Sequence, residues 1–150
     1  MKTVFDKATR AELIARIQTL DPTCTARWGK MNVYQMLRHC TIWEGWIQGK
    51  PPRTYKQAFI GRVFGRMALK SMLKDDRPLR KNIPTMKEFL SRETSGDVAA
   101  EQRTWAAFIE EYERYSNPDF VHDFFGTMTR EQIGQFAYKH ADHHLRQFGA

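Results

Sequence analysis

The apolar residues of this 150-residue chain recur with a helical period in four segments, and alternating strand-like runs are nearly absent. In the first segment, Thr9 is followed by Glu12 at the spacing of a helix-capping box. An apolar stripe follows, formed by Leu13, Ile14, Ile17 and Leu20. The pair Asp21-Pro22 is a stop signal, so we expect the first helix to run from Thr9 to about residue 20.

Three further segments carry helix-start signals of the same kind. Asn32 is a suitable N-cap for a second helix, and Gly49 a suitable end for it. The third helix is expected to begin at Asp97. The fourth is expected to begin at Thr129, where Gln132 completes a capping box, and to continue towards the C-terminus.

A long connection, residues 49–96, separates the second helix from the third. It contains a further helical pattern at 55–74 and a short turn after Thr85. Loops in helical bundles usually have about 2–8 residues, so this connection must pack as structure of its own. The pattern predicts an all-α fold, a four-helix bundle with one long helical crossover between helices 2 and 3. The length suits a single domain spanning 1–150.

The composition excludes several protein classes. With 41% hydrophobic and 27% charged residues, the chain is neither disordered nor membrane-embedded. No apolar run reaches the roughly 18 residues of a transmembrane helix, and the N-terminus lacks the apolar stretch of a secretory signal. Two cysteines make no disulfide framework, so we expect a cytoplasmic protein.

Three of the five histidines lie close to the C-terminus, at 140, 143 and 144. At about 100° per residue, His140 is centred on the apolar face of the fourth helix and His144 lies within it. His143 falls at the edge of that face, and its alternatives are a residue supporting a ligand, an edge ligand or a surface histidine. An i, i+4 pair of inward imidazoles is equally typical of a hydrogen-bonded core network and of a metal site.

Other polar residues are candidates for the same site. His39 flanks the apolar stripe of the second helix, and as a third imidazole it would leave an open position on a divalent ion. Glu44 lies on the apolar arc of that helix and either orients a ligand, acts as a general base or reaches solvent. Gln147 lies on the His140 face, where it would bond a ligand or substrate. His122 is expected to fix the loop before the fourth helix.

The basic residues are concentrated in one segment. Residues 53–81 contain nine Lys or Arg and two Asp, which accounts for the whole net charge of +7. Within it, Arg62, Arg66 and Lys70 recur every four residues beside an apolar stripe of Phe59, Val63 and Met67. This basic amphipathic pattern indicates a solvated face, an anionic-substrate funnel, a membrane surface or a nucleic-acid surface. No nucleic-acid motif accompanies it, so nucleic acid is the least favoured partner.

Three sequence motifs resemble one branch of the DinB-like (YfiT-like) superfamily, a branch catalogued as a domain of unknown function. The ending YKHADHHLRQFG, preceded by HDFFGTMTREQ, is the most specific of the three. RWGKMNVYQMLRHC is similar to the second-helix motif, and LRKNIPT to the middle segment. The resemblance covers nearly the whole chain. Asp123 departs from it, since a proline is expected after the histidine.

The resemblance implies a four-helix bundle of up-down-down-up order. In its metal-binding members, one histidine from the second helix and two from the fourth form the site, which here correspond to His39, His140 and His144. Some members are thiol-dependent S-transferases for low-molecular-weight thiols, others are described as metal-dependent hydrolases, and some hold no metal. The resemblance therefore supports the presence of a metal site more strongly than it supports any one reaction.

Two functional hypotheses follow. In the first, the three histidines hold zinc or nickel, which activates a water or a thiol for reaction with a small-molecule substrate. In the second, the protein is a non-enzymatic module that binds a partner or anionic surface through the helix at 55–74. A homodimer is a further possibility, because the sequence does not determine the oligomeric state.

Overall fold

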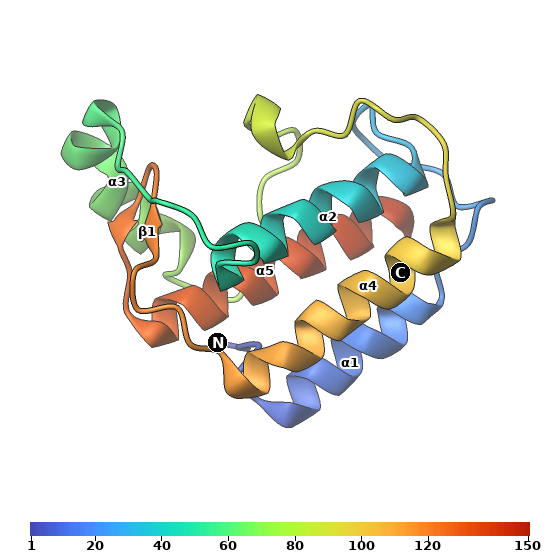
Figure 1. Cartoon of the computed structure of the whole chain (residues 1–150), viewed down its shortest axis with the longest axis horizontal. Coiled ribbons are helices and arrows are strands. Elements are labelled where there is room, and N and C mark those ends of the chain that lie inside the picture. The colour runs from blue at the N-terminus through green and yellow to red at the C-terminus, as the bar shows by residue number, and fades with distance from the viewer.

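The computed structural model describes residues 1–150 and is mainly helical, with 54% of the residues in helices (Figure 1). The α-helices are α1 (Lys7–Gln18), α2 (Val33–Gln48), α3 (Phe59–Met72), α4 (Val98–Glu111) and α5 (Arg130–Phe148). Two short 3-10 turns, η1 (Lys87–Phe89) and η2 (Tyr112–Arg114), and two strands, β1 (Val121–His122) and β2 (Gly126–Thr127), complete the chain. None of the helices combines the length and the apolarity needed to cross a membrane.

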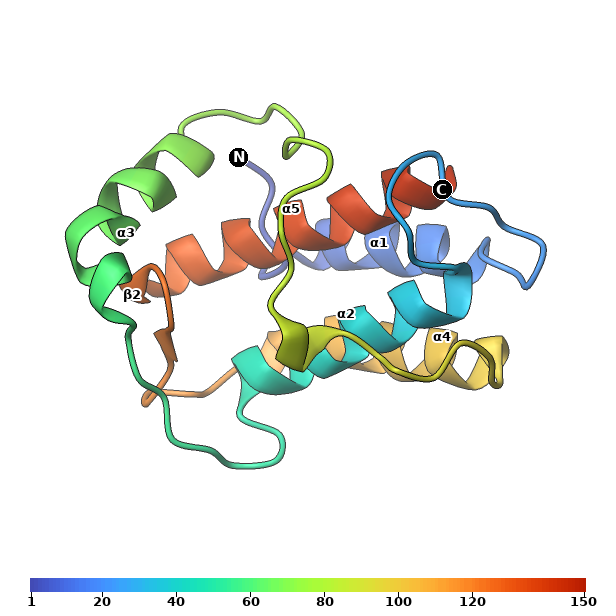
Figure 2. The same cartoon turned by 90° about the horizontal axis from the view of Figure 1, so that it is seen from above.

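Four of the helices pack around one apolar core. α4 lies between α1 and α2, and α5 contacts both α1 and α2 on the other side (Figures 1 and 2). The core contains 27 buried hydrophobic residues, and its largest fully buried side chains include Trp105, Tyr112, Leu13, Ile17, Met36 and Leu37. α5 thus has its inward face against α2, which places the histidines of the two helices opposite one another.

The predicted ends of α2 and α5 are confirmed. Asn32 and Gln35 form a reciprocal capping box at α2, and Gly49 ends that helix in the left-handed conformation with φ 68°. Thr129 and Gln132 form the equivalent box at α5. These caps fix where each helix begins, and therefore which side chains fall on the facing sides.

The predicted start of the first helix is wrong. α1 begins at Lys7 after Asp6, and Thr9 lies buried within the helix instead of capping it. The residues before α1 are held in place: Val4 is buried and its N–H donates to the carbonyl of Gly134 at 3.2 Å. The buried Arg10 donates to the carbonyls of Val4 and Phe5. These tertiary contacts outweigh the local capping signal.

The helix predicted at 55–74 is present but shorter. α3 covers Phe59–Met72, and it contacts β2 through the side that carries the buried Gly61, Gly65 and Leu69. A Cβ added at Gly61 or Gly65 would overlap with the backbone of Phe124. The two glycines therefore let α3 pack closely against the backbone of Phe124, and a larger side chain at either position would prevent this contact.

We expect Gly65→Val to destabilise the docking of α3, because the new side chain would collide with the Phe124 carbonyl. The free energy of unfolding should fall by about 1–3 kcal/mol, and α3 should become more sensitive to trypsin. Ser71→Val is the matched control, since Ser71 is exposed on the same helix. Equal losses in the two variants by denaturant titration would assign the effect to β-branching instead of to this contact.

Candidate metal centre

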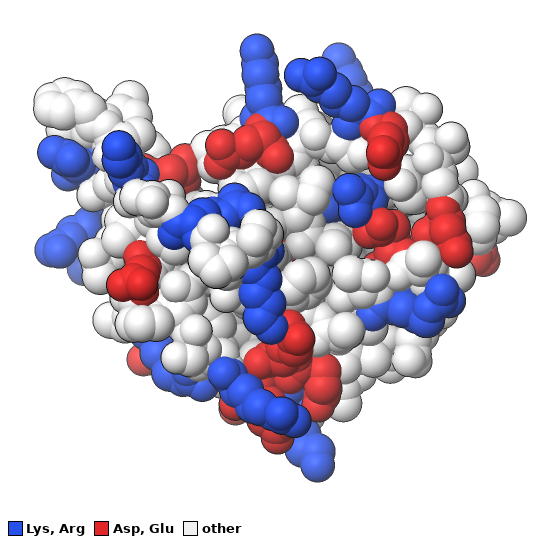
Figure 3. All heavy atoms as spheres, in the orientation of Figure 1, with Lys and Arg blue, Asp and Glu red and all other residues white.

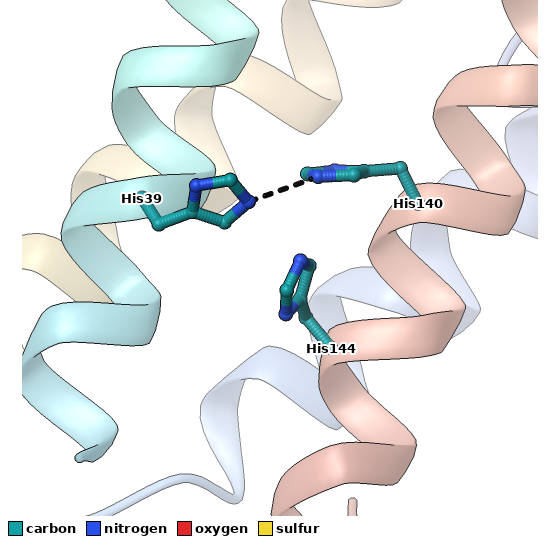
Figure 4. Close-up of side chains that lie close together, drawn as sticks. All are labelled: His39, His140 and His144. Atoms are coloured by element: carbon teal, nitrogen blue, oxygen red, sulfur yellow. Dashed lines mark hydrogen bonds between the residues drawn. The ribbon is translucent and has the colours of Figure 1, made fainter. Parts of the chain in front are cut away.

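Three imidazoles meet between α2 and α5. His39 extends from α2 towards His140 and His144, which lie one turn apart on α5 (Figure 4). One nitrogen from each ring forms a set whose members all lie within 4.8 Å of one another. Nε2 of His39 lies 3.1 Å from Nε2 of His140. His39 and His144 are almost fully buried, with 2% and 5% of their surfaces exposed.

Hydrogen bonds to oxygen atoms fix the protonation of two of these rings. Nδ1 of His39 lies 3.0 Å from the carbonyl oxygen of Phe89, which only accepts, so this Nδ1 carries the proton. The Gln147 amide NH₂ donates to the carbonyl of Trp28, which leaves its oxygen to accept from Nδ1 of His144 at 2.9 Å. In the neutral rings, Nε2 of His39 and Nε2 of His144 are therefore unprotonated, and the lone pair on Nε2 of His39 faces Nε2 of His140 at 3.1 Å.

The third imidazole, that of His140, is oriented by stacking. Its ring lies over the indole of Trp43 with centroids 3.9 Å apart and planes at 16°. Its Nδ1 is buried and has no hydrogen-bond partner. A neutral imidazole has one N–H and one lone pair, so at Nδ1 of His140 one of these two groups is left unsatisfied in either tautomer.

Burial lowers the pKa of all three imidazoles. The pKa values of His140 and His144 lie well below the ordinary histidine value, and the neighbouring imidazoles lower them further. The pKa of His39 is lowered by burial too, although its bond to the Phe89 carbonyl partly opposes this. The rings are therefore neutral at pH 7, which is the form that coordinates metal ions.

The donor set fits a divalent transition metal. Two nitrogens at about 2.0–2.1 Å from one tetrahedral ion are about 3.3 Å apart, close to the 3.1 Å between His39 and His140. Imidazoles whose other nitrogen donates to an oxygen are the usual ligands of zinc and nickel sites. His39, His140 and His144 are the residues that could hold such an ion.

A family described as a protein of unknown function, DUF1569, has a model that matches residues 5–150. The chain belongs to this family. No curated protein and no solved structure matches the sequence.

The other two histidines of the DUF1569 chain lie outside the converging set. His143 is half-buried and packs its ring edge-on against Trp28, with centroids 5.5 Å apart. Nδ1 of His122 accepts the backbone N–H groups of Phe124 and Phe125 at 3.1 and 3.2 Å. His122 thus holds the β1–β2 turn, in the loop where the sequence predicted a fixing role.

The structure does not bring Glu44 to the histidines, which corrects its proposed role as a general base or ligand-orienting residue. Glu44 is five residues after His39, about 140° further around α2, and so it faces α4. Its side chain is completely buried, and Tyr112 donates to its Oε2 at 2.6 Å. Burial raises the pKa of Glu44 to about 8, and the hydrogen bond from Tyr112 only partly opposes this rise. The helix-edge alternative, with the head group in solvent, is also wrong.

Sequence reasoning missed several residues that orient the imidazoles. The Phe89 carbonyl comes from η1 in the long connection, and the Trp28 carbonyl from the loop before α2. Every residue has a backbone carbonyl, so the residue types at these positions do not predict these two hydrogen bonds. Trp43, in contrast, is four residues after His39, and its place on the apolar stripe of α2 was a usable indication that it would reach α5.

The buried Glu44 should make stability depend on pH. Its folded-state pKa of about 8 lies above the ordinary glutamate value of about 4.5, so the stabilisation is fully present below pH 4.5 and is lost as pH rises towards 8. Glu44→Gln should not show this loss. Between pH 4.5 and 8, its free energy of unfolding relative to that of the wild type should therefore increase by roughly 1.4 kcal/mol per pH unit. Urea titrations of both proteins from pH 5 to 8 measure this; parallel curves would contradict a protonated, buried Glu44.

Proposed function

We propose that this DUF1569 chain is a divalent-metal protein with the DinB-like four-helix bundle as its single domain. The helices α1, α2, α4 and α5 around one core, with the long connection between α2 and α4, support the bundle. The proposed ligands are His39, His140 and His144, which come from the two helices that the sequence resemblance implies. Zinc or nickel is the proposed ion.

The observation that carries the proposal is the protonation pattern of the buried imidazoles. An ordinary core histidine uses both of its ring nitrogens in hydrogen bonds to the protein. Here the Phe89 carbonyl and the Gln147 amide oxygen take the Nδ1 protons of His39 and His144, and both Nε2 atoms are left facing a third imidazole. A cation would satisfy both of these lone pairs at once, together with that of Nε2 of His140 in the tautomer that carries its proton on Nδ1.

With only three protein ligands, the proposed site belongs to the open class that keeps a position for water or substrate. When bound, the ion would supply a Lewis acid that lowers the pKa of a water or a thiol. The residues of the chain would hold the ion, fix the tautomers of its ligands and surround it with apolar side chains. We therefore propose a cytoplasmic metal-dependent small-molecule enzyme, either a thiol S-transferase or a hydrolase.

A second candidate function is a non-enzymatic binding module. The observation in its favour is the outer face of α3, where Phe59, Val63 and Met67 are 81%, 60% and 68% exposed. This face lies on a separate helix from the histidines, so each function can be tested without disturbing the other.

We expect wild-type protein, purified without an affinity tag and stripped with a chelator, to bind one zinc or nickel ion in titration calorimetry. His39→Ala, His140→Ala and His144→Ala should each abolish this binding, because two imidazoles do not complete the set. Affinity should also fall as the pH is lowered, since protonated imidazole cannot coordinate.

His143→Ala is the matched control, because it removes a neighbouring imidazole that does not converge with the others. Its affinity should stay near that of wild type. Equal losses for His143→Ala and His144→Ala would contradict the assignment of ligands. Absence of binding by the folded wild-type protein would leave the three rings as a hydrogen-bond network in the core.

A further inference from the structure

One face of α3 exposes an unusual number of large apolar side chains. Five residues of this helix are 49–81% exposed, namely Phe59, Ile60, Val63, Phe64 and Met67. At about 100° per residue they occupy one continuous arc of the helix. We call this set the α3 apolar face. An ordinary amphipathic helix of a globular protein buries such an arc against the core, and α3 does the reverse.

The sequence of α3 explains why its apolar face points to solvent. Its packed side consists of Gly61, Gly65 and Leu69, and the first two residues have no room for a side chain beside Phe124. The start of the helix is also tied down, because the Ala58 N–H donates to the carbonyl of Asp123 at 2.7 Å. Turning the apolar face inward would place large side chains where the backbone of Phe124 lies.

Basic residues border the α3 apolar face. Arg62, Arg66 and Lys70 are exposed; the first two lie between the apolar arc and the packed side, and Lys70 lies at the near edge of the arc. No acidic residue occurs between Arg53 and Lys74, and the whole segment 53–81 has a charge of +7. In Figure 3, uncharged surface protrudes at the upper left, where Figure 1 places α3, with Lys and Arg side chains beside it.

We propose that the α3 apolar face docks onto an anionic lipid surface. A helix that lies in the membrane interface needs large apolar side chains on one arc and basic side chains next to it, and α3 has both. The apolar side chains would enter the boundary between head groups and acyl chains, and Arg62, Arg66 and Lys70 would pair with lipid phosphates and carboxylates. The helix would lie on the membrane and not cross it.

Charge argues against a second copy of the chain as the occupant. A symmetric pairing of two α3 apolar faces would bring the basic residues of both copies to one interface, with no acidic residue in either helix to neutralise them. An anionic bilayer supplies both the apolar phase and the neutralising charge. Each basic residue near such a surface contributes roughly five-fold to partitioning at moderate salt.

Full-length protein should co-sediment with vesicles of phosphatidylcholine and phosphatidylserine, and much less with phosphatidylcholine alone. Binding should decrease at high salt, because the attraction between exposed charges is screened. The variant Phe59→Ser/Val63→Ser/Met67→Ser should lose binding by at least about ten-fold. The variant Arg62→Glu/Arg66→Glu/Lys70→Glu should lose at least as much. Both variants should keep the wild-type circular dichroism spectrum, since the replaced side chains face solvent.

Lys7→Glu/Arg103→Glu/Arg114→Glu is the matched control, because it changes the net charge equally at exposed positions away from α3. It should keep most of the binding to phosphatidylserine vesicles. No vesicle binding by wild type, or equal losses in the control and the α3 charge variant, would overturn the proposal. Sedimentation equilibrium gives the other decisive outcome: a wild-type dimer that the serine variant converts to monomer would assign the α3 apolar face to a second copy.

Discussion

The packing of α2 against α5 is the constraint on which the candidate site depends. It brings Nε2 of His39 to 3.1 Å from Nε2 of His140, and burial lowers the pKa of all three imidazoles, which favours their neutral forms at pH 7. Neutral imidazoles offer one lone pair each, and in His39 and His144 the oxygen atoms of Phe89 and Gln147 determine which nitrogen offers it. The geometry of two helices and the position of two acceptor oxygens thus create a nitrogen-rich site without any charged ligand.

Helical periodicity was sufficient to predict the inward direction of His140 and His144, because both lie on the apolar arc of a helix with clear caps. His39 flanks its arc, so periodicity alone did not place it in the core, and the resemblance to a known superfamily added that step. Periodicity did not predict which helix Glu44 faces. The apolar arc of α2 is wide enough to face both α4 and α5, and the sequence does not say which of the two a given residue meets.

The helices themselves were predictable wherever local signals agreed with tertiary packing. Asn32 and Thr129 cap α2 and α5 as expected, whereas Thr9 does not cap α1, since the chain before it is held by Val4 and Arg10. α3 was predicted as a helix but not its orientation. Glycine has a low helix propensity, yet Gly61 and Gly65 form the side through which α3 packs against the backbone of Phe124.

X-ray absorption spectroscopy on protein purified without an affinity tag tests the central claim most directly, because it reports both the native ion and its ligands. The three-histidine account predicts near-stoichiometric zinc or nickel with a first shell of nitrogen and oxygen at about 2.0–2.1 Å, including the scattering pattern of three imidazoles. The metal should be absent from His144→Ala, and the shell of three imidazoles should be kept in His143→Ala. A metal-free native protein, or a shell with sulfur at about 2.3 Å, would contradict the account.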